Sequence, residues 1–259
     1  MASTIKRIAL QNKSSGKISF EDLAKLAPVL QTQSDRDFTP IWGVRAQISV
    51  LQKGDHIPTG VWPVFFIDPS GEPGGVGAGV HLDKHGKPYA FVTDEGYDSG
   101  DWTITASHEL LEMLADPFGN TFQSGPDMDP KSDGHLVNYL VEVGDPCETF
   151  SYTIDNIKVT DFVTHDYYLA NTNGPYDFMG QLSKPFEVPP EGCYISWQDP
   201  KDGHWHQKTP EGKFIDGGSI DSKKNPREDR DSSFGEEEDE RRHNLQKVLS
   251  THQRKGKTK

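Results

Sequence analysis

The chain has few cysteines, a deficit of basic residues and no long apolar run. Its two cysteines, Cys147 and Cys193, are too few for a disulfide-stapled scaffold or a cysteine-rich zinc module. With 27 basic against 40 acidic side chains, the net charge of −13 argues against a nucleic-acid partner, because phosphate neutralisation needs a surplus of Lys and Arg. No stretch approaches the ~18 apolar residues of a membrane-spanning helix, so we expect no membrane partner.

Apolar residues are also scarce, at 33% of the chain. Adding the 25 glycines brings this fraction to about 43%, close to the roughly 45–50% of globular chains on the same count, so a core can form. The N-terminus contains only a short apolar stretch, well below the length of a secretory signal. We therefore expect a cytoplasmic protein, or one exported without a classical signal peptide. The cysteines are expected as two buried thiols, with one disulfide bridge as the alternative.

The composition changes sharply after Asp216. Residues 217–259 contain 11 Lys and Arg and 9 Asp and Glu, with almost no apolar periodicity. Such a segment cannot bury enough apolar surface to offset its ordering entropy. The sequence therefore predicts one folded domain over residues 1–216 and a disordered charged tail over residues 217–259.

The order of the expected elements predicts an α+β fold. Ser19 followed by Asp22 has the spacing of a capping box and indicates a helix start, and Pro28 is expected to bend or shorten that helix. A second, longer helix should lie between Asp101 and the helix-ending Pro117. Strand-like runs occupy residues 44–51, 61–68, 137–143, 151–159 and 192–197. Pro63 suggests that the second of these strands starts late or lies at a sheet edge.

The longer helix carries the most informative motif, His-Glu-Leu-Leu-Glu at residues 108–112. At 100° per residue, Thr105, His108, Glu109, Glu112 and Asp116 fall within an arc of ~100°, opposite an apolar face. His108 and Glu112 lie one turn apart and can converge on a single ion. The alternative interpretation is a solvated polar helix face with no chemical role.

This motif differs from the metalloprotease pattern His-Glu-x-x-His in its last residue. That pattern binds zinc with two imidazoles and uses the intervening Glu as a general base on water. Here Glu112 replaces the second His, and a carboxylate is an acceptable zinc ligand that also suits harder cations. Glu109, displaced around the helix from the ligands, would then reach the water rather than the ion.

A zinc site needs a third protein ligand, and several residues compete for that role. We prefer Asp145, because Gly144 would free the backbone to aim it inward, although an Asp-Pro turn is an equally simple interpretation. Glu142 and Asp116 are the less favoured carboxylates, and Cys147 offers a thiolate. His81 could approach the same site, but a lone His on a strand is more often structural.

Two parts of the chain resemble known proteins. Residues 108–117 together with residues 142–147 resemble plant phosphate-induced (exordium-type) proteins and bacterial and fungal proteins related to zincin metallopeptidases. Residues 176–194 also resemble the bacterial members, so the resemblance spans roughly residues 100–195. It implies a zincin-like fold, in which a twisted sheet has an edge strand within residues 77–92. That strand would line a cleft floored by the metal-binding helix and hold an extended peptide.

The resulting hypothesis is a zinc-dependent metallopeptidase acting on a peptide or protein substrate. His108, Glu112 and Asp145 would bind the metal, and Glu109 would be the catalytic base. One alternative is a catalytically inactive zincin-like binding protein with a structural metal. A second alternative is a metal-free structural or assembly protein, with the acidic helix face in water.

Overall fold

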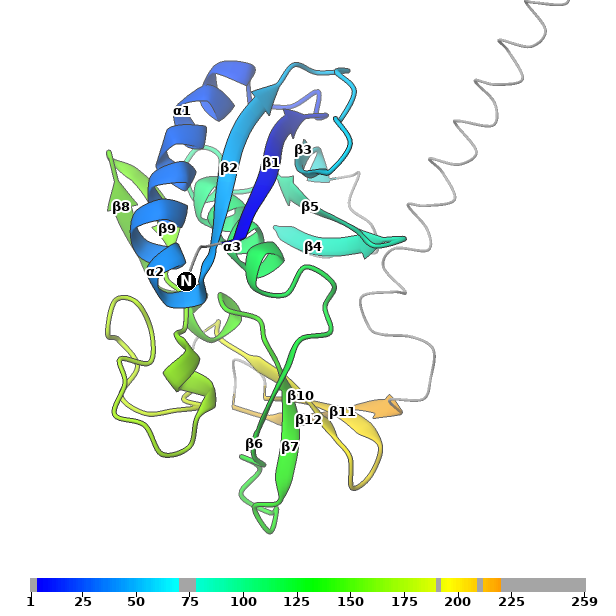
Figure 1. Cartoon of the computed structure of the whole chain (residues 1–259), viewed down its shortest axis with the longest axis vertical. Coiled ribbons are helices and arrows are strands. Elements are labelled where there is room, and N and C mark those ends of the chain that lie inside the picture. Colours follow the sequence, from blue (N-terminus) through cyan, green and yellow to red (C-terminus); the bar gives the residue numbers. More distant parts are fainter. Residues whose placement is uncertain (1–3, 70–77, 190–191, 209–211, 220–259) are drawn as a thin grey trace, which may run out of the picture.

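The computed structural model describes residues 4–69, 78–189, 192–208 and 212–219. Within these ranges the chain has a mixed α+β fold in which strands outnumber helices, as the sequence predicted. Two five-stranded sheets are accompanied by a two-stranded hairpin. Figure 1 shows the first sheet together with α1 and α3 in its upper half, and the second sheet in its lower half. No helix among the described residues is long and apolar enough to cross a membrane.

The first sheet is mostly parallel, in the order β2-β1-β3-β5-β4. Its strands are β1 (Thr4–Asn12), β2 (Val44–Leu51), β3 (Val61–Ile67), β4 (Gly79–Lys84) and β5 (Lys87–Thr93). Only β4 runs antiparallel to its neighbour, β5, and it forms one edge of the sheet. Strand β1 was not predicted, because a parallel strand that is buried on both faces has a short apolar run without alternation. In β1 this run is only Ile8, Ala9 and Leu10.

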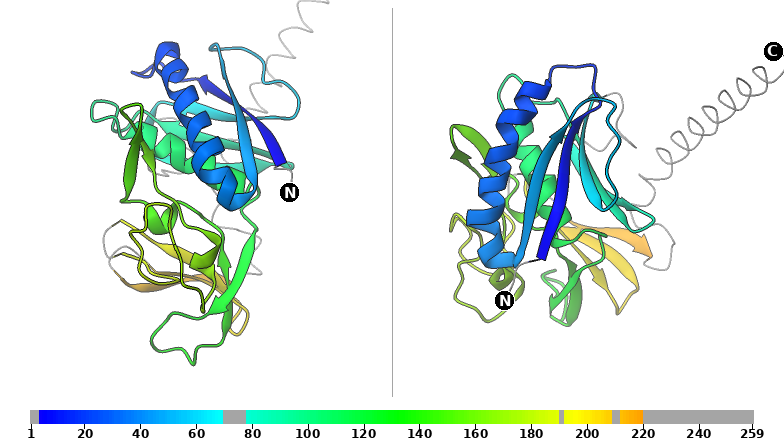
Figure 2. Two further views of the ribbon diagram at one scale, coloured as in Figure 1. Left: turned by 60° about the vertical axis from the view of Figure 1, so that its left-hand side comes forward. Right: turned by 45° about the horizontal axis from the view of Figure 1, so that its top comes forward.

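Four helical segments accompany this sheet: α1 (Phe20–Thr32), a π-helical turn η1 (Gln33–Phe38), α2 (Thr39–Trp42) and α3 (Trp102–Ala115). The predicted capping box is present, since the Ser19 hydroxyl accepts from the Asp22 backbone N–H and the Asp22 carboxylate accepts from Ser19. Figure 2 shows α1 alongside β2 from two further directions. The long helix is also confirmed, with Asp101 at its N-cap position and Asp116 at its C-cap.

Pro28 does not shorten its helix, and Pro63 neither delays its strand nor lies at a sheet edge. The helix α1 continues through Pro28 to Thr32, and burial of Val29 and Leu30 in the core stabilises the turn that lacks one backbone donor. Strand β3 begins at Val61 and lies in the interior of the sheet. Its pairing with β5 starts only at Val64, so at Pro63 the strand has a neighbour on the β1 side alone.

The second sheet is antiparallel, in the order β12-β11-β10-β7-β6. Its strands are β6 (Phe122–Pro126), β7 (Leu136–Leu140), β10 (Ile195–Asp199), β11 (His204–Lys208) and β12 (Phe214–Ser219). Strand β12 crosses the predicted domain boundary at Asp216, because Gly218 and Ser219 pair with β11. The folded domain therefore extends at least to Ser219, and the rest of the predicted tail lies outside the described residues.

The run predicted as one strand over residues 151–159 is a hairpin of β8 (Ser151–Ile154) and β9 (Ile157–Thr160). Asp155 and Asn156 form its turn with φ angles of +49° and +64°. Asn and Asp tolerate this left-handed region, which the tight turns of two-stranded hairpins require. The sequence therefore predicted β structure here, but not the turn that divides it into two antiparallel strands.

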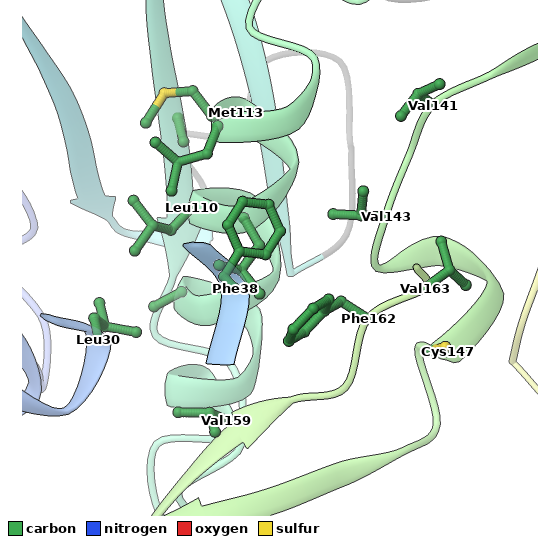
Figure 3. Packing of buried hydrophobic residues seen from close by; sticks show 14 of the residues in the cluster. Leu30, Phe38, Leu110, Met113, Val141, Val143, Cys147, Val159, Phe162 and Val163 are labelled. Atoms are coloured by element: carbon green, nitrogen blue, oxygen red, sulfur yellow. The ribbon is translucent and has the colours of Figure 1, made fainter. Parts of the chain in front are cut away.

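One continuous hydrophobic core joins the two halves of the fold. Figure 3 shows Leu110 and Met113 of α3 in this core, together with Phe38 and Phe162. The rings of Phe38 and Phe162 pack edge to face with centroids 5.2 Å apart. Cys147 and Cys193 are buried free thiols, as expected. Burial raises the pKa of the Cys147 thiol well above its usual value, so this side chain is a neutral core residue.

Candidate functional site

The polar face of α3 is buried. His108 is 9% exposed, Glu109 6% and Glu112 2%. The backbone of β4 covers one side of this face, since Gly79 lies against Glu109, and the segment after β7 covers another, since Gly144 lies against His108. The interpretation of this face as solvated is therefore wrong. A pattern of polar residues on a helix does not indicate which other elements pack against that face.

Three of the residues expected to bind metal come together. The His108 Nε2 atom lies 3.3 Å from Glu112 Oε1 and 3.3 Å from Asp145 Oδ1. Asp145 opens the short 3₁₀ helix η3 (Asp145–Cys147), which follows β7 and brings the carboxylate to the side of α3. One ligand atom from each of the three residues lies within 4.8 Å of the others, so the group could hold a metal ion.

The lengths of these contacts fit an ion better than a direct ion pair. Elsewhere in the protein, His135–Asp199 and His204–Asp216 are paired at 2.8 Å. That is the usual length of a charge-assisted N–H···O bond. Two ligands of a tetrahedral zinc ion, each bonded at about 2.0–2.1 Å, are separated by about 3.3–3.4 Å. One imidazole nitrogen and two carboxylate oxygens are also donors that zinc accepts.

Gly144 contributes to the site for a different reason from the expected one. Its φ of −90° and ψ of −36° are in the ordinary right-handed region, so the position needs no special backbone freedom. A Cβ atom at this position would lie 2.5 Å from His108 Nδ1 and 2.6 Å from Cε1. The imidazole ring therefore packs directly on the peptide backbone. Gly144 also donates its N–H to Glu112 Oε1 at 3.2 Å, which helps to orient the carboxylate.

We expect Gly144→Ala to weaken metal binding by about 10–100-fold, the range for changes that misplace a metal ligand. The new methyl group must push the His108 ring away from Glu112 and Asp145. Competition with a chelator of known affinity measures the effect. Gly125→Ala is a matched control, because its Cβ would meet Phe186 Cζ at 2.5 Å, and its three nearest atoms belong to Phe186 and Tyr139 rather than to these ligands. An unchanged affinity in Gly144→Ala, or an equal loss in Gly125→Ala, would contradict this account.

His108 and Glu112 shift each other's pKa in opposite directions. Burial alone would lower the pKa of His108, but the charge of Glu112 and the contact with Asp145 outweigh it and raise this pKa well above the usual value. Burial would likewise raise the pKa of Glu112, and the neighbouring His108 instead holds it well below its usual value. A bound cation must displace the His108 proton. Metal binding should therefore weaken as the pH falls.

His81 was expected to be structural, but it lies in this site. The side chain comes from the edge strand β4 and is 1% exposed. Its Nδ1 atom is 3.3 Å from Glu112 Oε2 and 3.7 Å from Glu109 Oε2. Only the resemblance pointed to this strand, because His81 is far from the helix motif along the chain. Its buried neighbours Val80 and Leu82 show that both faces of β4 are covered here.

The other candidate ligands are distributed differently. Glu142 is buried, with Oε2 3.8 Å from His81 Nε2. Asp116 uses Oδ1 to accept from the backbone N–H groups of Asn120 and Thr121, both at 3.0 Å, and so stabilises the turn after α3. Cys147 groups with Asp161 and Asp177 rather than with His108.

Two further residues at the site were missed by the motif search. The Tyr194 hydroxyl contacts the Asp145 carboxylate, and the Tyr194 backbone N–H donates to the Asp145 carbonyl at 3.2 Å. Burial, followed by the charges of Asp145 and Glu112, raises the pKa of Tyr194 well above its usual value, so the hydroxyl remains a donor. Glu148 is a solvent-exposed residue near these carboxylates. Partial burial by the surrounding chain, together with the charges of Glu112 and Glu109, nevertheless raises the pKa of its carboxyl group.

Comparison of the chain with protein-family models, with curated proteins and with solved structures gives no match. A functional conclusion therefore rests on the geometry and chemistry of these residues.

Proposed function

We propose that this protein is a zinc-dependent metallopeptidase with a zincin-like fold. His108, Glu112 and Asp145 would hold the ion, and Glu109 would serve as the general base. The observation that carries this proposal is the pair of 3.3 Å separations around His108 Nε2, which match the edge of a zinc tetrahedron. The mostly parallel sheet with one antiparallel edge strand beside α3 supports the zincin-like part of the proposal.

Glu109 is placed to handle the proton of the attacking water. When bound, zinc supplies a Lewis acid that polarises a carbonyl and lowers the pKa of water. Glu109 follows His108 directly on α3 and belongs to neither of the ligand groups that include Glu112. With His108 it retains the most solvent contact among the buried residues of the site. Its carboxylate would accept the proton from water and then deliver it to the leaving amine.

The edge strand β4 is the natural place for a peptide. Among the described residues it pairs with β5 alone, so its other edge can add a main-chain strand. Gly79 at the start of β4 packs directly on the base, since a Cβ there would lie 2.9 Å from both Cγ and Oε1 of Glu109. A peptide aligned on this strand would therefore pass close to the carboxylate that acts on the water.

The degree of burial supports a second candidate, a zincin-like binding protein whose ion is structural. Structural zinc sites are closed, whereas catalytic ones keep an open position. Glu112, Asp145 and Glu142 are each less than 5% exposed. Incubation of the metal-loaded protein with a broad peptide library separates the two candidates, because only the peptidase cleaves.

The proposed metal site is tested by plasma mass spectrometry on tag-free protein equilibrated with zinc and then desalted. We expect at least one zinc ion per chain in the wild type, and a loss in both His108→Ala and Glu112→Ala, because each removes a ligand. His165→Ala is a matched control, since this imidazole packs against Trp42 with ring centroids 4.2 Å apart and belongs to none of the groups among the described residues that could hold a metal ion. Absence of zinc from the wild type would refute both metal-dependent candidates.

A further inference from the structure

The two oxygens of Glu112 face two different imidazoles. Oε1 lies 3.3 Å from His108 Nε2, and Oε2 lies 3.3 Å from His81 Nδ1. A carboxylate with one donor nitrogen beside each oxygen has the arrangement of a ligand that bridges two ions. Glu142 is the third member of this second group, because one ligand atom each from His81, Glu112 and Glu142 lies within 4.8 Å of the others, and Glu142 Oε2 lies 3.8 Å from the Nε2 side of the His81 ring.

We propose that the site binds two divalent cations bridged by Glu112, the second of them held by His81 and Glu142. This inference rests on the proposed function, because the two ions share Glu112. His108 and Asp145 complete the first ion's ligands. In two-metal sites the ions lie about 3.5–4 Å apart, a separation that one bridging carboxylate spans.

The orientation of His81 supports its role as a ligand. Its Nε2 atom lies 3.1 Å from the Asp116 carbonyl oxygen, so the ring donates there and turns Nδ1 toward Glu112. Histidines that bind metals commonly donate their other ring N–H to a backbone carbonyl in this way. Asp116 is itself fixed, because its carboxylate accepts two backbone N–H groups of the following turn. The carbonyl group that orients His81 therefore comes from the C-cap residue of α3.

The charge of the site also favours two ions over one. Four buried carboxylates meet here, those of Glu109, Glu112, Glu142 and Asp145. Their ion pairs run to two imidazoles, which can supply at most two positive charges. Buried carboxylates are costly unless their charge is compensated, and each bound divalent cation would compensate two of them.

Metal stoichiometry tests this inference. We expect about two ions per chain in wild-type protein equilibrated with Zn²⁺ or Mn²⁺. His81→Ala and Glu142→Gln should each bind about one ion, and His165→Ala should still bind two. In the Mn²⁺ form, electron paramagnetic resonance should show a spin-coupled pair in the wild type and an isolated ion in His81→Ala. Glu142→Gln keeps the side-chain shape, so it remains informative if His81→Ala fails to fold.

The outcomes separate this inference from the proposed function. One ion per chain that is lost in His108→Ala but kept in His81→Ala and Glu142→Gln would overturn the second ion and leave the first. No ion in the wild type would overturn both. Two ions without magnetic coupling would place the second outside the Glu112 bridge and would also overturn this inference.

Discussion

Glu109→Gln is expected to lower peptide hydrolysis by about 10²–10⁴-fold, the contribution of a positioned general base, without any change in metal content. Glutamine keeps the shape of the side chain in the space left by Gly79, but its amide cannot take a proton from water. The turnover number on a cleaved peptide and the metal content of the same sample measure the two effects together.

Glu148→Gln serves as the control for this substitution. Glu148 is an exposed carboxylate at the rim that acts electrostatically on the same site, so neutralising it changes the local charge without removing the base. We expect it to retain most of the activity. Loss of metal in Glu109→Gln would show that Glu109 is a ligand. Full activity in Glu109→Gln would remove it from the chemistry.

A second large effect is expected at a buried acid pair away from the metal ligands. Asp161 and Asp177 are fully buried, and one carboxyl oxygen of each lies within 4.8 Å of the other. Burial, together with the neighbouring Asp177, raises the pKa of Asp161 to about 8. At neutral pH Asp161 is therefore mostly protonated in the folded protein. Asp177 accepts backbone N–H groups from Gln181 and Leu182, both at 2.8 Å.

This raised pKa should make stability fall with rising pH. Between the unfolded value near 4 and the folded value of about 8, only the folded state holds the proton, so the free energy of unfolding falls by about 1.4 kcal/mol per pH unit. Asp161→Asn should abolish this contribution, because the amide can donate to Asp177 at every pH. Denaturant unfolding at pH 5, 7 and 9 should show the variant gaining on the wild type as the pH rises.

Asp177→Asn is the matched control for the acid pair. Its amide nitrogen would face a backbone N–H that now donates to a carboxylate oxygen, so we expect destabilisation at all pH values. An Asp161→Asn variant with the same pH dependence as the wild type would show that Asp161 is ionised in the folded protein.

The two long helices were predicted from patterns within short stretches of the sequence. The periodicity of residues 101–117 identified α3, and the capping box at Ser19 identified the start of α1. Residues that act through distant neighbours were misjudged. His81 was placed with structural residues because its partner Glu112 is brought to it only by packing of β4 on α3. Gly144 was recognised, but its role depends on the position of His108.

The burial of the site was the least predictable feature. The helix motif indicates which residues can converge on an ion, whereas the elements that exclude water come from other parts of the chain. Tyr194 illustrates this, because its contact with Asp145 depends on the start of the second sheet's strand β10 (Ile195–Asp199). The spacing of residues within the helix motif gives no information about such contacts with distant segments.

The order of the site residues along the chain has a consequence for synthesis. His81 and the residues of α3 are made before Asp145, and Tyr194 is made last of all. A growing chain that has completed the first sheet and α3 still lacks the Asp145 side of the cluster. The cluster therefore becomes complete only after the second half has been made and packed. A truncated chain that ends before Asp145 should therefore be unable to bring His108, Glu112 and Asp145 together.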